Sequence, residues 1–105
     1  MRQINSDEFE STVIESGKPV LVDFTATWCG PCQRLAPTLE ALSQELGEKA
    51  TFVKVDIDES PNLAEQYGVE GVPTLMLFKG GEPVDRKVGG LPKPVLAGWL
   101  SSLVG

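Results

Sequence analysis

Short apolar runs separated by turn-forming residues predict the strands of this chain. Two of the runs are almost continuous, which is typical of strands covered on both faces in a sheet, and a third segment is rich in β-branched and aromatic residues. The Gly80-Gly81 pair favours a tight hairpin turn, so the strands on either side of it should be antiparallel. The predicted strands are residues 20–24, 51–56, 74–78 and 84–88.

Apolar side chains at helical spacing predict four helices. The clearest stripe repeats at spacings of four, three and four and predicts a helix that ends near Gly47, with Pro37 bending it. Its members are Leu35, Leu39, Leu42 and Leu46. A first helix should be capped by Asn5 or Ser6, with Glu8 in a capping box, Phe9 and Val13 on one face and Gly17 at its end. A short helix should begin at Ser60-Pro61 and end before Gly68. The apolar face of a closing helix carries Val95, Leu96, Trp99, Leu100 and Leu103.

The order of these elements predicts the fold class. An extended arm or strand is followed by alternating helices and strands, and the chain ends in a hairpin and a last helix. This order predicts an α/β fold in which a mixed sheet, parallel with an antiparallel hairpin, has helices on both faces. At 105 residues, we expect one domain over residues 1–105.

Composition and charge exclude several classes of function. The net charge is −6, from fifteen acidic and nine basic residues without a basic cluster, so we expect no nucleic-acid partner. Histidine is absent, which excludes Ser-His-Asp and Cys-His nucleophiles, and two cysteines cannot complete a zinc site. A metal or iron–sulfur site shared between two chains is an alternative, but we expect no metal and a monomer.

The amino terminus predicts the location of the protein. Residues 1–8 are largely polar, without the apolar core of a secretory signal, and no segment is long and apolar enough for a membrane span. We therefore expect a cytoplasmic protein with no membrane partner.

The only two cysteines lie three positions apart in Trp28-Cys29-Gly30-Pro31-Cys32, between a predicted strand and a predicted helix. This placement favours a thiol–disulfide redox site, because the amino end of a helix lowers the pKa of a thiol that lies over its free N–H groups. We predict that Cys29 is the nucleophile and that the more shielded Cys32 resolves the mixed disulfide. The alternative is a pair of buried or structurally bridged cysteines.

Asp23 is the one carboxylate in the otherwise apolar strand over residues 20–24. Ionising it there is unfavourable, so its pKa should rise towards the working pH and Asp23 should act as the base that deprotonates Cys32. The alternative is a solvated residue at the polar edge of the strand. The nearby acids of residues 56–59 are expected to form a solvated loop.

Four groups of residues resemble the thioredoxin family, and the resemblance covers essentially the whole chain. Residues 23–32 are similar to the active-site strand and loop of that family, residues 72–74 to its cis-proline loop, and residues 78–81 and 88–90 to its later turns. The resemblance implies a thioredoxin fold and a protein disulfide reductase, a dithiol electron carrier that reduces client proteins. It also implies re-reduction by a thioredoxin reductase that draws on NADPH, and no cofactor beyond the redox-active Cys29–Cys32 disulfide.

The resemblance also implies roles for other residues. Lys54 resembles the partner of the buried acid, the alternative being a solvated lysine on an exposed strand face. Pro73 should follow a cis peptide bond and lie against the cysteines, and Val72 should offer backbone hydrogen bonds to an extended client. Trp28 should border an apolar groove, the alternative being a core tryptophan. The predicted client-binding residues are Trp28, Gly30, Pro31, Gly71, Val72, Pro73, Gly89 and Gly90.

Between the cysteines, Gly30 and Pro31 favour a reductant. Proline near the first turn of a helix stiffens the loop, and there is no histidine in that place as the oxidising relatives have. Two other functions remain as alternatives: a thiol oxidase or isomerase of the same fold, and a binding module whose redox state is incidental.

Overall fold

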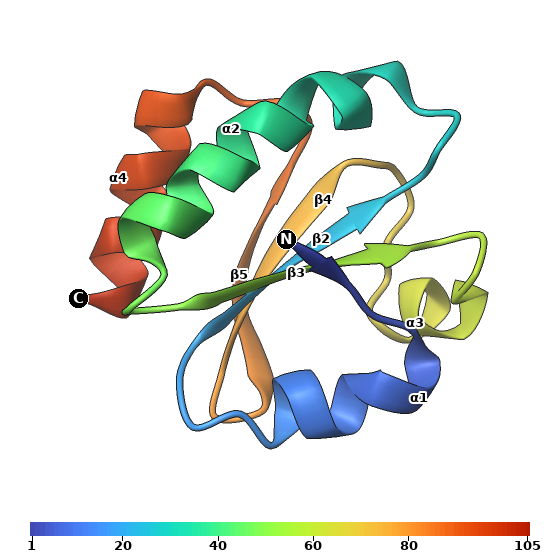
Figure 1. The fold of residues 1–105 in the computed structure, drawn as a ribbon. Helices are drawn as coiled ribbons and strands as arrows, with labels where there is room; N and C mark the ends of the chain where they lie inside the picture. Colours follow the sequence, from blue (N-terminus) through green and yellow to red (C-terminus); the bar gives the residue numbers. More distant parts are fainter.

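A five-stranded mixed sheet forms the centre of the molecule in the computed structural model, which describes residues 1–105 (Figure 1). The strand order is β1-β3-β2-β4-β5, in which β3 runs parallel to β1 and β2, whereas β4 is antiparallel to β2 and β5 to β4. The strands are β1 (Arg2–Gln3), β2 (Val20–Thr25), β3 (Thr51–Asp56), β4 (Thr74–Lys79) and β5 (Glu82–Val88). The predicted mixed sheet is confirmed, and the apolar run of β2 lies at its centre.

Helices cover both faces of this sheet. The helices are α1 (Ser6–Phe9), the π-helix η1 (Glu10–Ile14), α2 (Gly30–Leu46), α3 (Pro61–Gln66) and α4 (Lys93–Val104). α1, η1 and α3 pack on one face, and α2 and α4 pack on the other (Figure 1). The predicted α/β fold with helices on both faces is therefore confirmed. None of the helices has the length and apolar character that crossing a membrane requires.

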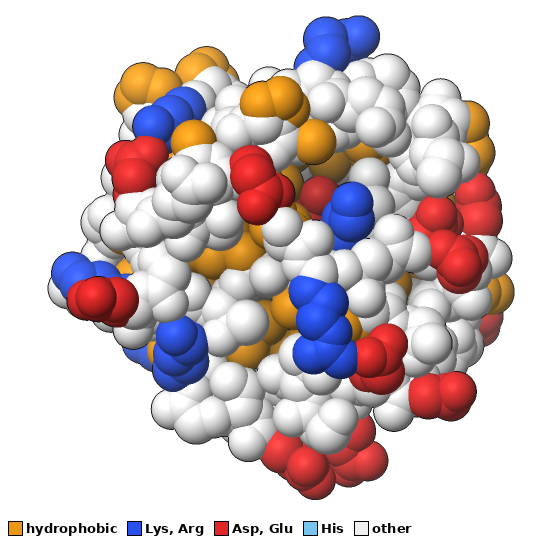
Figure 2. Space-filling view, viewed as in Figure 1, with side chains coloured by type: hydrophobic (Ala, Val, Ile, Leu, Met, Phe, Trp, Pro, Cys, Tyr) orange, Lys and Arg blue, Asp and Glu red, His pale blue; other side chains and the backbone are white.

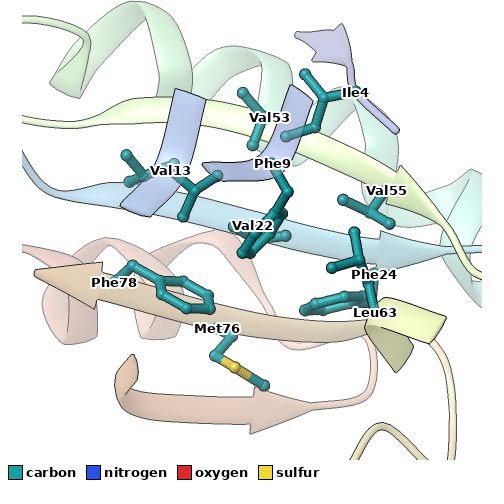
Figure 3. Packing of buried hydrophobic residues seen from close by; sticks show 11 residues of the cluster. Ile4, Phe9, Val13, Val22, Phe24, Val53, Val55, Leu63, Met76 and Phe78 are labelled. Carbon is teal, nitrogen blue, oxygen red and sulfur yellow. The ribbon is translucent and has the colours of Figure 1, made fainter. Parts of the chain in front are cut away.

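Alternation along β2 assigns its side chains to two separate cores. Val20, Val22 and Phe24 belong to the core under α1 and α3, whereas Leu21 belongs to the core under α2 and α4. In Figure 3 the first core is seen from close by, with Phe9 next to the strand residues. Because successive side chains of a strand point to opposite faces, Asp23 lies on the same face as Leu21, below α2.

The first helix differs from its prediction. The capping box is confirmed, since Asn5 Oδ1 accepts from the backbone N–H groups of Asp7 and Glu8, and Glu8 accepts from Asn5 N. Its second half is a π-helix that ends at Ile14 and not at Gly17. This half carries adjacent β-branched side chains, which crowd the preceding turn of an α-helix.

The closing helix presents a narrower apolar face than predicted. Leu96 and Leu100 are fully buried, but Val95 is 49% exposed, so its assignment to the buried face was wrong. Trp99 is half-buried, and its Nε1 donates to Asp85 Oδ2 at 2.9 Å. This hydrogen bond links α4 to β5.

Both edges of the sheet are short or irregular. β1 is two residues long. β5 carries Pro83 and charged side chains, and the ladder between β4 and β5 shifts register between Leu77 and Phe78. Proline removes a backbone donor, and a register shift bends the strand, so β5 is a poor template for a further strand.

Candidate active site

Cys29 and Cys32 lie at the junction between β2 and α2 and are joined as a disulfide, with Cα atoms 5.3 Å apart. Cys29 is the N-cap of α2, and its Sγ accepts from the backbone N–H of Cys32 at 3.2 Å. Pro31 occupies the first turn, where a missing N–H leaves no helical bond unmade. The predicted position of Cys29 at the start of the helix is confirmed, and a negative charge on its sulfur is stabilised there.

Both sulfurs are shielded in this disulfide-bonded state. Cys29 is 5% exposed and Cys32 is 3% exposed, and they pack with Ala26, Ile57 and Val72. The exposed fraction of Cys32 is the lower of the two, which agrees with the prediction that Cys32 is the more shielded residue, but the difference is small. Access of a client to Cys29 therefore depends on the exposed residues around it.

The loop before β4 lies directly against Cys29. The Val72–Pro73 peptide bond is cis, as predicted, and Cys29 Sγ lies 3.6 Å from the carbonyl oxygen of Val72. Pro73 is buried, and its carbonyl accepts from Gly89 N at 2.9 Å. The fold thus brings residues 72, 73 and 89 to one side of the disulfide, although all three are distant from the cysteines in sequence.

The other predicted client-binding residues lie around Cys29 and the loop before β4. Gly30, Pro31, Gly71 and Gly90 are exposed, and a Cβ on Gly90 would lie 4.0 Å from the carbonyl oxygen of Pro31. The last loop therefore packs closely against the start of α2. The carbonyl of Gly71 accepts from Thr74 Oγ1 at 2.6 Å, which fixes the beginning of the cis-proline loop.

Trp28 is 68% exposed, so the alternative of a core tryptophan is wrong. Its Nε1 donates to Asp58 Oδ2 at 2.8 Å, and this hydrogen bond holds the ring beside the disulfide-bearing loop. Asp58 could not be singled out from the sequence, because the contact joins residues thirty positions apart.

Asp23 is buried, with an exposed fraction of 5%, so the alternative of a solvated strand edge is wrong. Its Oδ1 has no hydrogen-bond partner. Desolvation raises the pKa of Asp23 from 3.8 to about 7, and the charge of Lys54 opposes this rise. The predicted direction of the shift and its cause are confirmed.

One cavity connects Asp23 to the disulfide. It has a volume of about 130 Å³, and both Asp23 and Cys32 line it, together with Lys54 and Asp56. Lys54 lies opposite Asp23 in the register of β2 and β3 and is half-buried, but the two side chains form no ion pair. Lys54 therefore faces the cavity and is not a freely solvated strand residue.

Asp56 also lines this cavity, although the sequence pattern did not indicate it. It is 6% exposed, and its Oδ1 accepts from the backbone N–H groups of Asp58 and Glu59 at 2.8 and 3.4 Å. The prediction of a wholly solvated loop was wrong for Asp56, although Asp58 and Glu59 are exposed. An aspartate that ends a strand and precedes a turn commonly binds backbone two residues on, and this signal could have identified it.

Comparisons with known proteins agree with this geometry. A model of the family described as thioredoxin matches residues 1–102. The chain is 46% identical over 104 residues to a thioredoxin of Rhodospirillum rubrum, covering 99% of this chain and 100% of that protein. It is 49% identical over 98 residues to a thioredoxin of Synechocystis sp., covering 93% of this chain and 92% of that protein. It is 46% identical over 106 residues to the chloroplastic thioredoxin X of Arabidopsis thaliana, covering 99% of this chain and 58% of that protein.

The family match therefore extends over nearly the whole chain. The relatives agree with it at a level of identity that also fixes the fold. The bonded cysteine pair at the start of α2 is the arrangement that thiol–disulfide exchange requires. This chain belongs to the thioredoxin family of protein disulfide oxidoreductases.

Proposed function

We propose that this chain is a single-domain, monomeric carrier that reduces disulfides of client proteins in the cytoplasm and is re-reduced by a thioredoxin reductase with electrons from NADPH. The observation that carries the proposal is the cavity that joins the buried Asp23 to Cys32. A disulfide with a purely structural role does not require a titratable group next to one of its sulfurs. A reducing compartment is required because the active form is the dithiol.

The first step is attack by Cys29. In the dithiol form, the Cys29 thiolate attacks one sulfur of the client disulfide and forms a mixed disulfide, while the other client sulfur leaves as a thiolate. The N-cap position supports this role, because the backbone N–H of Cys32 already points at the Cys29 sulfur. Cys29 is thus the proposed nucleophile.

The second step is resolution by Cys32. Its thiol passes a proton to the Asp23 carboxylate, and the resulting thiolate attacks Cys29 Sγ, which releases the second client sulfur as a thiolate. The client gains two electrons, and the chain is left with the Cys29–Cys32 disulfide. A cavity of about 130 Å³ has room for water, which can carry the proton between the two side chains. Lys54 is proposed to stabilise the ionised carboxylate, since its charge lowers the pKa of Asp23.

The residues around Cys29 are proposed to hold the client. Val72 lies against the Cys29 sulfur and is half-buried, so its backbone can pair with an extended client strand beside the reacting atoms. The exposed Trp28 ring offers apolar contact. The remaining proposed client-binding residues have small or compact side chains, so a client backbone can approach them closely. They are Gly30, Pro31, Gly71, Pro73, Gly89 and Gly90.

The proposed function is tested by insulin reduction coupled to NADPH oxidation through a thioredoxin reductase. We expect the wild type to support turnover, and Cys29→Ser, Cys32→Ser and the double variant to support none. Cys32→Ser should also accumulate a mixed disulfide with the client, because its nucleophile is intact and its resolving thiol is gone. Reduction by the double variant, or trapping by Cys29→Ser in place of Cys32→Ser, would contradict the assigned roles.

A further inference from the structure

The guanidinium of Arg34 makes no hydrogen bond and no ion pair inside the molecule. Of the nine basic residues, two pair with carboxylates, four donate to backbone carbonyls and one lies over an aromatic ring. In that order they are Arg2 and Lys93; Lys18, Lys49, Lys79 and Arg86; and Lys87. Lys54 lines the cavity behind Cys32, which leaves the exposed guanidinium of Arg34.

The guanidinium of Arg34 lies beside Gly30, the residue between Cys29 and Pro31. Arg34 is four residues after Gly30 on α2, and its Nη1 lies 3.3 Å from the position that a Cβ on Gly30 would occupy. Gly30 directly follows Cys29. A charged group bound to this guanidinium would therefore lie close to the segment that carries the attacking sulfur.

A groove of about 200 Å³ opens next to Arg34 between α2 and the loop before α4. Pro31 and Gly90, two of the proposed client-binding residues, belong to its lining. The remaining lining residues are Arg34, Leu35, Thr38 and Leu91, so no acidic side chain neutralises the guanidinium there. The groove is thus continuous with the surface proposed to hold the client.

We propose that this groove is a specificity subsite in which Arg34 binds the carboxylate of an aspartate or glutamate near the client cysteine. This inference rests on the proposed function. The occupant follows from charge and shape: an arginine fork matches a carboxylate with two parallel hydrogen bonds, and Thr38 adds a hydroxyl. The subsite makes acidic client segments the preferred substrates of this chain.

The net negative charge of the molecule explains why contact at such a subsite matters for an acidic client. The net charge is −6, and on the face of the molecule drawn in Figure 2 the basic side chains are separate from one another and acidic side chains lie among them. An acidic client is therefore repelled at long range. At physiological ionic strength this repulsion is screened beyond about 8 Å, whereas a carboxylate in contact with Arg34 is not screened in the same way. Contact at the groove then decides which segment is retained.

The test uses the fully reduced protein, without a reductase, and a set of disulfide peptides that differ at one position. Glutamate, glutamine or lysine is placed in turn at each of the two positions on either side of the attacked cysteine, and the second-order rate of peptide reduction is measured by quenched-flow. An exposed ion pair corresponds to a rate difference of about two- to fivefold. We expect the wild type to prefer glutamate over glutamine by that factor for at least one position, and to reduce the lysine peptide most slowly.

Variants assign the preference to Arg34. Arg34→Met should bring the glutamate-to-glutamine rate ratio to about one, Arg34→Glu should invert it, and Arg34→Lys should retain part of it. Lys49→Gln is the matched control, because it removes the same charge beyond the far end of α2, about 25 Å from the disulfide. It should keep the wild-type ratio.

Two results would overturn the subsite. One is a wild-type protein that shows no preference for glutamate at any position, and the other is a preference that Lys49→Gln lowers as much as Arg34→Met. Neither result affects the proposed function, because the glutamine peptide is still reduced and reduction still requires both cysteines. If the wild type reduces no peptide in the set, the proposed function fails and the subsite fails with it.

Discussion

At the scale of the single residue, burial of the Asp23 carboxyl lowers the stability of the folded state when this group is ionised. The carboxyl is buried, one oxygen has no partner, and its pKa is raised to about 7 by desolvation. A raised pKa means that the folded state binds the proton more tightly than the unfolded state does. The contribution of Asp23 to stability is therefore fully present below its ordinary pKa of 3.8 and is lost as pH rises through about 7.

Asp23→Asn should stabilise the protein at alkaline pH. The difference between 3.8 and about 7 corresponds to about 4 kcal/mol at pH 8. The gain should shrink as pH falls from 7 and disappear near pH 4, where the wild-type carboxyl is protonated in both states. Urea unfolding of the oxidised proteins between pH 4 and 8 measures it, and a gain that does not vary with pH would exclude burial of a titrating carboxyl as its source.

The same substitution should slow the resolving step. Asparagine cannot accept a proton, so release of a client from the mixed disulfide should fall by about a hundredfold or more, while the initial attack by Cys29 changes little. In the wild type, the release rate should rise as pH increases through about 7, where Asp23 ionises. Stopped-flow measurement of each step separates them, and unchanged release kinetics would remove Asp23 from the mechanism.

At the scale of the secondary-structure element, α2 provides the reactivity of the site. Cys29 caps this helix, and Cys32 lies one turn further along, so one element fixes the distance between the sulfurs and the N–H groups that face them. The helix begins at Gly30 because Pro31 favours a first turn. Leu35, Leu39 and Leu42 then anchor it to the sheet.

In the reduced protein, Cys29 should be alkylated faster at pH 7 than a free thiol in a short peptide. The amino end of α2 favours the thiolate, which is the species that reacts with iodoacetamide. Mass spectrometry of quenched samples, with urea-unfolded protein as the control, gives the rate at each cysteine. Equal rates for Cys29 in the folded and unfolded protein would show that the helix does not activate it.

Elements with strong local signals were predicted from the sequence. β3 matches its predicted bounds residue for residue, and β2 and β4 each extend one residue further, because continuous apolar runs leave few alternatives to a covered strand. The π-helix was not predicted, because α- and π-helices share nearly the same apolar pattern. Asp56 and Arg34 were also missed, since their importance arises from a cavity and a groove between elements distant in sequence.

At the scale of the whole molecule, two cores on opposite faces of the sheet hold β2 and α2 in place, and the active site lies where these two elements meet. The core under α2 and α4 supports the cysteine-bearing helix, and the core under α1 and α3 supports the other face of β2. The central strand is covered on both sides, and the cavity that Asp23 lines is formed by residues of β1, β2, β3 and α2. Burial of Asp23 is therefore a property of the complete fold.

Leu42→Ala should destabilise the whole protein by about 2–5 kcal/mol, because Leu42 is fully buried and the substitution leaves a cavity under α2. Leu46→Ala is the matched control on the same stripe, and its half-buried side chain should give a smaller loss. Urea unfolding of the oxidised proteins measures both. A loss at Leu46 equal to that at Leu42 would contradict the burial assigned to this face.

The blunted borders of the sheet have a consequence for how such a carrier works in a crowded cell. A β1 of two residues and a β5 interrupted by Pro83 and a register shift give neighbouring copies little to add a strand to. Copies that do not stack remain free to diffuse even when abundant. Each one can then deliver its pair of electrons to a distant target and return, and the supply of reducing power scales with the number of molecules.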